Sequence, residues 1–306
     1  MKALVTGAEG FVGPYLIKEL LDKDYEVVGS YHNELKEIID NVDYKKLDVT
    51  NFDSVKETLK ETQPDLIFHL AAISNVKLSF KKPKLTREVN VGGSKNIFDA
   101  CFSLKNKPRI LNISSAHVYG IPEEIPITEE HPLKPGSPYA STKLETEKLA
   151  KKYIENGLDI IIVRSFNHIG PGQSPSFVCS AFAKQIAEIE EGREPVMKVG
   201  NLKAKRDFTD VRDVVRAYVK AVKKAEPGEP YNICSGKSYS IQKILNLLLS
   251  LSESDIQVKK DQDRMRKSDI PILLGDYSKF NQITGWKPEI SINKSLKDIL
   301  NYWRKQ

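Results

Sequence analysis

The sequence predicts an α/β fold, with a doubly wound parallel sheet and a smaller, interleaved α/β part that covers a substrate. Two observations support this prediction. Short β-branched apolar runs alternate with amphipathic helical stretches through the first half of the chain, which is the pattern of βαβ units. The runs at 66–70 and 160–163 are almost entirely apolar, as is typical of strands covered on both faces. Right-handed crossovers between such strands favour a doubly wound sheet.

The first half of the chain supplies the strands of this sheet and the helices that join them. Strands are expected at Lys2–Thr6, Glu26–Tyr31, Tyr44–Leu47, Leu66–Leu70, Arg109–Ser114 and Asp159–Arg164. Helices are expected at Phe11–Leu21, Phe52–Thr62, Leu85–Leu104 and Tyr139–Asn156.

The alternation ends after residue 164, where glycines and prolines between 170 and 175 interrupt the pattern. Further helices are expected at Phe177–Glu191, Val211–Lys224, Ile241–Leu251 and Leu296–Trp303. We therefore divide the chain into a sheet-forming domain, residues 1–165 and 208–228, and a smaller substrate-binding domain, residues 166–207 and 229–306.

The composition argues against several classes of protein. The 306 residues are 40% hydrophobic and 29% charged, an ordinary globular balance. No apolar run approaches the ~20 residues of a membrane span, and the N-terminus enters a strand without the features of a signal peptide. We therefore expect a cytoplasmic protein without a membrane partner. The net charge of +6 is scattered, apart from a basic stretch at 198–206, which favours a pocket for a small polyanion over a nucleic-acid surface.

The three cysteines, Cys101, Cys179 and Cys234, are widely spaced and form no C-x-x-C pair. We therefore expect buried thiols rather than disulfides or a zinc site. The five histidines have no metal-ligand spacing, so no metal is expected.

A glycine turn follows the first expected strand and opens the first helix. It reads Thr6-Gly7-Ala8-Glu9-Gly10-Phe11-Val12-Gly13, a G-x-x-G-x-x-G spacing. In such a turn Gly7 allows a sharp bend, Gly10 lets the backbone approach a pyrophosphate, and Gly13 lets the helix pack closely. The pyrophosphate would lie at the helix N-terminus. The turn therefore predicts a dinucleotide-binding Rossmann sheet, with Phe11 and Val12 also beside the cofactor.

The end of the second expected strand bears on the choice of cofactor. It reads Gly29-Ser30-Tyr31-His32-Asn33, without the acidic residue that would bind the ribose 2′-hydroxyl of NADH and without an arginine for a 2′-phosphate. We expect NADPH or NADH at Ser30 and His32, and favour NADPH because no carboxylate repels its phosphate. Asp48, followed by Val49, is either a ligand for the adenine amino group or a helix N-cap or turn residue.

Tyr139 and Lys143 lie four residues apart at the start of an expected helix, so their side chains share one face. A tyrosine has a reference pKa of ~10, and a lysine ammonium about 5 Å away would bring that pKa to roughly 8. The phenol would then serve as a general acid or base near neutral pH. Ser115, at the end of the fifth expected strand, faces the ligand crevice and can hydrogen-bond a substrate carbonyl.

These features and four further segments resemble the extended short-chain dehydrogenase/reductase family. The segments are His69-Leu70-Ala71-Ala72, Asn90-Val91-x-Gly93, Ser114-Ser115-x-x-Val118-Tyr119-Gly120 and Arg206-Asp207-Phe208-x-Asp210-Val211-x-Asp213. The resemblance implies that Ser115, Tyr139 and Lys143 form a catalytic triad, and that Lys143 binds the nicotinamide ribose. Further cofactor contacts are expected from Val49, Leu70, Ala71, Ala72 and Phe166.

Within this family, two parts of the chain resemble the branch that acts on GDP-mannose derivatives. They are Arg164–Gln173, and Phe177–Ile186 followed by Val199–Leu202. The resemblance implies a GDP-sugar substrate, namely GDP-4-keto-6-deoxy-D-mannose, whose C4 ketone would be reduced to give GDP-D-rhamnose. Dehydratases of the family carry a glutamate two places after the catalytic serine, where this chain has His117. His117 is therefore either a contact for the sugar or an ordinary loop histidine.

Candidates for the remaining substrate contacts are polar residues. Ser74 is expected at the sugar, Asn167, Lys184, Arg206 and Arg266 at the diphosphate, and Asp269 at the nucleotide ribose. Each of them could instead be a solvated surface residue, although the motif around Arg206 supports its role better.

Three other functions stay open. A nucleotide-sugar 4-epimerase would use the same triad and retain its NAD. A GDP-mannose 4,6-dehydratase would act on the unmodified sugar, and a non-catalytic NADP-binding protein would need no triad. The resemblance also implies a homodimer, in which the helices at 85–104 and 139–156 of two chains form a four-helix bundle. The alternative is a monomer with single exposed hydrophobic residues.

Overall fold

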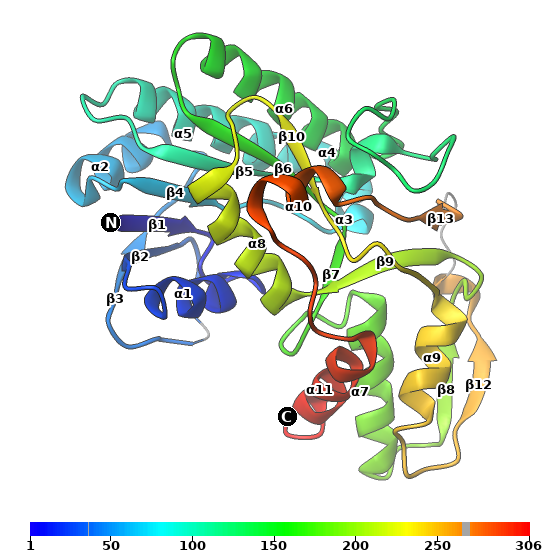
Figure 1. Ribbon diagram of the computed structural model, residues 1–306. Coiled ribbons are helices and arrows are strands. Elements are labelled where there is room, and N and C mark those ends of the chain that lie inside the picture. The colour runs from blue at the N-terminus through cyan, green and yellow to red at the C-terminus, as the bar shows by residue number, and fades with distance from the viewer. Residues whose placement is uncertain (36, 265–269) are drawn as a thin grey trace.

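The computed structural model describes residues 1–35, 37–264 and 270–306. A seven-stranded sheet, with every neighbouring pair parallel, has the order β10-β6-β5-β4-β1-β2-β3 (Figure 1). Its strands are β1 (Lys2–Thr6), β2 (Glu26–Tyr31), β3 (Val42–Lys46), β4 (Leu66–His69), β5 (Arg109–Ser115), β6 (Ile160–Ser165) and β10 (Pro230–Ile233). The strands β2 and β3 follow β1 on one side of the sheet, and β5, β6 and β10 follow β4 on the other side. The predicted doubly wound parallel sheet is confirmed.

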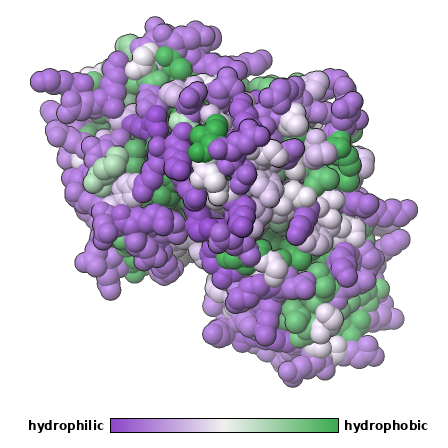
Figure 2. Space-filling model, viewed as in Figure 1, coloured by the Kyte–Doolittle hydropathy of each residue, from purple (hydrophilic) through white to green (hydrophobic). Residues whose placement is uncertain are grey.

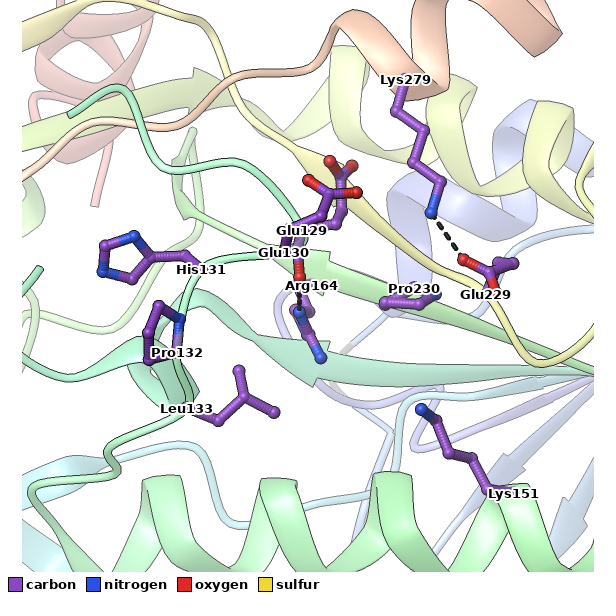
Figure 3. A pocket seen from close by; sticks show the side chains of 10 residues that line it. All are labelled: Glu129, Glu130, His131, Pro132, Leu133, Lys151, Arg164, Glu229, Pro230 and Lys279. Atoms are coloured by element: carbon purple, nitrogen blue, oxygen red, sulfur yellow. Dashed lines mark hydrogen bonds and ion pairs between the residues drawn. The ribbon is translucent and has the colours of Figure 1, made fainter. Parts of the chain in front are cut away.

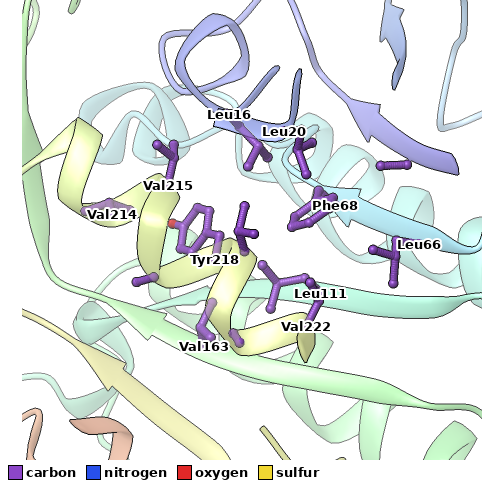
Figure 4. Packing of buried hydrophobic residues seen from close by; sticks show 14 of the residues in the cluster. Leu16, Leu20, Leu66, Phe68, Leu111, Val163, Val214, Val215, Tyr218 and Val222 are labelled. Carbon is purple, nitrogen blue, oxygen red and sulfur yellow. The ribbon is translucent and has the colours of Figure 1, made fainter. Parts of the chain in front are cut away.

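Helices cover both faces of this sheet. They are α1 (Gly13–Leu21) and α8 (Val211–Lys224) on one face, and α2 (Phe52–Thr62), α5 (Gly93–Phe102) and α6 (Pro138–Glu155) on the other. Successive residues of β4 point to opposite faces: Leu66 and Phe68 pack with α1 and α8 (Figure 4), whereas Ile67 packs with the other group. A strand buried on both faces needs an unbroken apolar run, which explains the composition of β4 and β6.

Parts of the second half of the chain form a smaller lobe, in the lower part of Figure 1. Strands β7 (Asn167–Ile169), β9 (Lys205–Asp210), β11 (Ser238–Ser240) and β13 (Ile272–Leu273) make one sheet, and β8 (Val196–Val199) pairs with β12 (Gln257–Lys260). Helices α7 (Val178–Glu190), α9 (Ile241–Leu249) and α11 (Ile292–Trp303) enclose a separate core that contains Phe182, Leu245 and Leu296.

Two helices differ from their predicted form. The helix expected at 85–104 is divided into α4 (Pro83–Arg87), a π-helical turn (Glu88–Gly92) and α5, and a short α3 (Val76–Lys81) precedes it. The last helix begins at Ile292 instead of Leu296, because Ser291 caps its N-terminus by accepting a hydrogen bond from the Lys294 N–H.

The predicted boundary at 228/229 also needs correction. The β10 strand pairs with β6 and lies at the edge of the large sheet, and its Tyr231 and Ile233 belong to the α1–α8 core. Phe280 of α10 (Ser278–Thr284) joins the same core. These two segments had been assigned to the smaller domain. The other predicted domain boundaries stay predictions.

The face of the molecule in Figure 2 is mainly hydrophilic, with small separate groups of hydrophobic residues. Among the described residues, no helix is both long and apolar enough to span a membrane. The three cysteines are buried and free.

Candidate active site

The sheet reverses its strand order between β1 and β4, and loops from the carboxyl ends of both strands meet there. Gly7, directly after β1, has a φ of +70°, and a Cβ added to it would lie 2.9 Å from the Ala71 Cα atom. A Cβ on Gly13 would lie 2.3 Å from the Ala8 carbonyl oxygen. Both positions therefore require glycine. Gly7 needs it for its positive φ and for its close approach to Ala71, and Gly13 needs it because the Ala8 backbone leaves no space for a side chain.

The turn leads directly into α1, which begins at Gly13 with Pro14 in its first turn. Gly10 donates its N–H to the Gly7 carbonyl at 3.0 Å, so the loop folds tightly back on itself in front of the helix. Phe11 and Val12 lie on this loop, and the Phe11 ring stacks on the His168 ring with centroids 6.0 Å apart. The loop brings the glycine turn next to β7.

Ser30 and His32 lie at the end of β2, as predicted. Ser30 is buried, and the His32 imidazole lies 3.8 Å from an Asp48 carboxylate oxygen. Asp48 accepts hydrogen bonds from the Thr50 N–H at 2.9 Å and the Thr50 hydroxyl at 2.7 Å. The turn-capping role of Asp48 is thus observed, while its role at an adenine ring stays a prediction.

The loop after β4 contains Leu70, Ala71, Ala72 and Ser74, of which Ser74 is exposed. The Ala71 N–H donates to the Thr6 hydroxyl at 3.2 Å, which fixes this loop beside the glycine turn. Val49 packs against the start of α5, where a Cβ on Gly93 would come within 2.8 Å of its methyl group.

Three predicted catalytic residues meet at the end of β5. Ser115 is the last residue of that strand, and Tyr139 and Lys143 occupy the first two turns of α6. Ser137 caps α6 by accepting a hydrogen bond from the Ala140 N–H at 3.2 Å. The Ser115 side chain hydrogen-bonds Tyr139, and the Lys143 ammonium donates to the Ile113 carbonyl at 2.7 Å. All three side chains are buried.

The protonation of these groups differs from the expectation. Burial raises the pKa of Tyr139, and the hydrogen bond from Ser115 only partly opposes it. Burial also lowers the pKa of Lys143 to about 8, against the attraction of the Glu147 carboxylate. The prediction that Lys143 lowers the tyrosine pKa is therefore wrong for this arrangement, because loss of water around the phenolate dominates. Tyr139 is protonated at neutral pH and can act as a proton donor.

A buried ion pair behind the triad was missed by sequence reasoning. Arg164 donates to both Glu147 carboxylate oxygens, at 3.1 and 2.8 Å, and the Ser114 hydroxyl donates to the same carboxylate. The signal was available: Glu147 lies four residues after Lys143, on the face of α6 that meets the sheet. Arg164 also lies against a polar pocket that Lys151, Glu229 and Lys279 help to line (Figure 3).

His117 lies beside the triad, in the 3₁₀ turn Ala116–Tyr119 that follows β5. Its ring meets the Tyr139 ring edge to face, with centroids 6.0 Å apart. The position where a dehydratase would carry a glutamate is thus close to the Tyr139 phenol.

The predicted substrate contacts lie on several elements of the smaller lobe. Asn167 is in β7 next to Phe166, and its buried Oδ1 atom has no hydrogen-bond partner among the described residues. Arg206 is a buried residue of β9, and its guanidinium donates to the Lys205 and Ile270 carbonyls. Lys184 in α7 pairs with Glu188 at 2.7 Å. Arg266 and Asp269 lie outside the described residues.

The chain also matches a known family. The family model described as GDP-mannose 4,6 dehydratase aligns with residues 4–299, which is nearly the entire sequence. The chain belongs to the GDP-mannose 4,6-dehydratase family. The predicted relationship to the extended short-chain dehydrogenases is confirmed by this match.

Individual members of the family and their structures are similar over their full length. A GDP-6-deoxy-D-mannose reductase of Pseudomonas aeruginosa is 34% identical, with 99% of this chain and 97% of the relative covered. A GDP-6-deoxy-D-talose 4-dehydrogenase of Aggregatibacter actinomycetemcomitans is also 34% identical, with 93% and 92% covered. The solved structure of RMD from Pseudomonas aeruginosa complexed with NADPH superposes with a TM-score of 0.88 at 33% identity, covering 99% of each chain.

Proposed function

We propose that this protein reduces the C4 ketone of GDP-4-keto-6-deoxy-D-mannose to the alcohol of GDP-D-rhamnose, using NADPH. The observation that carries the proposal is the buried cluster of Ser115, Tyr139 and Lys143 at the carboxyl end of β5. The full-length similarity to a GDP-6-deoxy-D-mannose reductase supports the substrate.

The glycine turn would hold the dinucleotide. Backbone atoms of Ala71 and Ala8 leave no room for side chains at Gly7 and Gly13, so the turn stays narrow in front of the N-terminus of α1. When bound there, NADPH supplies a hydride to the sugar carbon. Gly10, Phe11 and Val12 would contact the cofactor beside these two glycines. The loop residues Leu70, Ala71, Ala72, Val49 and Phe166 would contact it as well, with Ser30, His32 and Asp48 at its adenosine end.

The triad supplies the acid chemistry of the reduction. Ser115 and Tyr139 would both donate hydrogen bonds to the ketone oxygen, which polarises the carbonyl. As the oxygen gains negative charge, Tyr139 transfers its proton to it, and the alcohol forms. The Lys143 ammonium, held by the Ile113 carbonyl, then stabilises the phenolate and would also bind the nicotinamide ribose. His117 and Ser74 would face the sugar, and Asn167, Lys184 and Arg206 the diphosphate.

The 34% identity to a GDP-6-deoxy-D-talose 4-dehydrogenase supports a second candidate product. Reduction of the same ketone from its other face would give the C4 epimer, a 6-deoxytalose derivative. The two products are distinguished by NMR of the sugar, since their C4 protons have different couplings.

The test is incubation of the purified protein with GDP-4-keto-6-deoxy-D-mannose and NADPH. We expect stoichiometric loss of NADPH absorbance and a 6-deoxyhexose product with the rhamnose configuration. Incubation with GDP-mannose alone should leave it nearly unchanged, because no carboxylate occupies position 117. Conversion of GDP-mannose to the 4-keto sugar at a rate comparable with the reduction would identify a dehydratase. Interconversion of unmodified nucleotide sugars without loss of NADPH would identify an epimerase.

We further propose that two copies associate through α4, α5 and α6. Exposed apolar side chains on and next to these helices support this: Phe80 is 58% exposed, Leu85 40% and Phe102 44%.

A further inference from the structure

Two hydrogen bonds join the glycine turn to the end of β2. The Ala8 N–H donates to the Ser30 carbonyl at 2.8 Å, and the His32 N–H donates to the Oε1 atom of Glu9 at 2.9 Å. Glu9 directly precedes Gly10 in the turn, and His32 directly follows β2. The Glu9 carboxylate therefore lies at the segment where the adenosine end of the cofactor is proposed to bind.

This position of Glu9 corrects one expectation from the sequence. The preference for NADPH rests on the absence of a carboxylate from residues 29–33, which could repel its 2′-phosphate. The structure brings a carboxylate to this segment from the glycine turn, since Glu9 precedes His32 by 23 residues. The sequence pattern did not indicate this contact, because it joins two segments that are distant along the chain.

The second oxygen of the Glu9 carboxylate lacks a partner. Its Oε2 atom is buried and has no hydrogen-bond partner within the described part of the chain. A carboxylate oxygen that is removed from water costs free energy unless a donor reaches it. The Oε2 atom is therefore an acceptor that a ligand with a hydroxyl group would satisfy.

NADH and NADPH differ in what they present to such an acceptor. The ribose 2′-hydroxyl of NADH can donate a hydrogen bond, whereas the 2′-phosphate of NADPH offers acceptor oxygens and a charge of about −1.5 to −2. Repulsion between a carboxylate and a phosphate about 5 Å apart corresponds to about a tenfold loss of affinity, even at the dielectric constant of water. A carboxylate at this segment therefore favours the hydroxyl.

Asp48 is the other carboxylate near this segment, and its charge is moderated by its surroundings. Its Oδ1 atom accepts both the N–H and the hydroxyl of Thr50. Its side chain is 43% exposed, and its other oxygen lies 3.8 Å from the His32 imidazole. Water and Thr50 therefore already stabilise the Asp48 charge, so we expect Glu9 to have the larger effect on the cofactor.

We propose that Glu9 is a specificity-determining residue for the cofactor. It accepts a hydrogen bond from the 2′-hydroxyl of NADH and opposes the 2′-phosphate of NADPH, and it thereby limits the preference for NADPH. This inference rests on the proposed function for the presence of a nicotinamide cofactor at the glycine turn. It does not depend on the identity of the sugar.

The binding test compares ADP-ribose with 2′-phospho-ADP-ribose, which differ only in the 2′-phosphate and contain no nicotinamide. Glu9→Gln removes the charge, and its amide oxygen can still accept from the His32 N–H. Calorimetric titration at low ionic strength, where screening is weak, should show the ratio of the two Kd values shifted at least fivefold toward 2′-phospho-ADP-ribose. A smaller shift overturns the proposal.

A second variant separates the charge of Glu9 from its contact with the backbone. Glu9→Ala removes both the carboxylate and the acceptor for the His32 N–H, so exchange of the His32 amide hydrogen, followed by NMR, should be faster than in Glu9→Gln. The ratio of Kd values should nevertheless shift at least fivefold in both variants. A shift confined to Glu9→Ala would assign the effect to the placement of β2 and overturn the proposal. If Glu9→Gln fails to fold, a shift below fivefold in Glu9→Ala overturns it.

The matched control lies at the other end of the same strand. Glu26, the first residue of β2, is 66% exposed and pairs with Lys2 at 2.9 Å. Glu26→Gln removes the same charge from the protein and should leave the ratio of Kd values within twofold of the parent. A shift as large as that of Glu9→Gln would show that the net charge of the protein controls the ratio, which contradicts the proposal.

Kinetic measurements keep this inference distinct from the proposed function. With the ketone substrate, Glu9→Gln should raise the ratio of kcat/KM for NADPH and NADH at least fivefold. The change should appear in KM, because the adenosine end of the cofactor takes no part in hydride transfer. Absence of ketone reduction by the parent protein, with the shift in binding present, would refute only the proposed function. Ketone reduction with an unchanged binding ratio in Glu9→Gln would refute only the role of Glu9.

Discussion

Arg164 and Glu147 form an ion pair in which Nη2 and Oε2 are 2.8 Å apart and each side chain is only 3% exposed. The pair lies one helical turn beyond Lys143. Removal of one partner leaves a charge buried without compensation, which typically costs about 3–5 kcal/mol. We therefore expect Glu147→Ala to lower the free energy of unfolding by about that amount in urea titrations. The double variant Glu147→Met, Arg164→Met should recover at least half of the loss. A loss below about 1 kcal/mol in Glu147→Ala would mean that water reaches Arg164.

Tyr139→Phe removes the proton donor and keeps the ring. We expect kcat to fall by about 10²–10⁴-fold, the usual contribution of a positioned acid. The Kd for NADPH should change less than threefold, because the hydroxyl acts in the transition state. Stopped-flow measurement of hydride transfer with fluorescence titration of NADPH checks both values. Near-normal kcat would assign the proton to another group, and His117, whose ring lies 6.0 Å from the Tyr139 ring, is a candidate.

Lys143 makes stability depend on pH in a defined direction. Burial lowers its pKa from 10.5 to about 8, so the folded state disfavours the charged form. The resulting destabilisation is complete below pH 8, declines as the pH rises from 8 to 10.5, and amounts to about 3 kcal/mol at most. Lys143→Met should therefore be more stable than the parent at pH 7, with a smaller advantage at pH 9.5. The Ile113 carbonyl loses a donor in this variant, which reduces the gain.

Unfolding curves at the two pH values provide the test. A Lys143→Met variant that is less stable than the parent at pH 7 would show that the hydrogen bond outweighs the burial of charge. Its catalytic activity should be lost in either case.

The residues at the end of β2 predict a modest preference for NADPH. Ser30 and His32 offer hydrogen bonds, but neither provides a fixed positive charge for a 2′-phosphate. The ratio of kcat/KM for NADPH and NADH should stay below about a thousandfold, or roughly 4 kcal/mol. His32→Asp should shift the ratio toward NADH by repelling the phosphate. A larger ratio in the parent would require a basic residue from another part of the chain.

The proposed dimer predicts that a charge introduced at Leu85 disrupts the association of two chains, whereas a charge introduced at Ile283 does not. Leu85 in α4 is 40% exposed, and Ile283 in α10 is 38% exposed. Leu85→Glu should convert a dimer into monomers in sedimentation velocity experiments, because a charge would be buried at the interface. Ile283→Glu, the matched control, should leave the dimer intact. A parent protein that sediments as a monomer at micromolar concentration would exclude this interface.

Local patterns in the sequence predicted much of the architecture. The unbroken apolar run in β4, the glycine turn and the Tyr139–Lys143 spacing each encode their structure within a few residues. The π-helical turn Glu88–Gly92 was not predicted. The Asn90 side chain within it is held by partners distant in sequence, the Ile73 N–H and the Thr142 hydroxyl, which no local pattern indicates. The direction of the Tyr139 pKa shift was predicted wrongly, since the prediction counted the charge of Lys143 and omitted burial. Glu147 and Arg164 were overlooked as partners because their pairing needs β6 to lie under α6.

The path of the chain between its two lobes has a consequence for proteolysis and unfolding. After β6 the polypeptide passes to β7, returns for α8 and β10, leaves again for β11, and comes back once more for α10. A protease that cuts any one of these passages leaves parts of the larger lobe's core in both pieces, so neither lobe is released as a folded fragment. Melting should then be a single cooperative event, and a nucleotide sugar held between the lobes would raise the melting temperature of the entire chain rather than of one half.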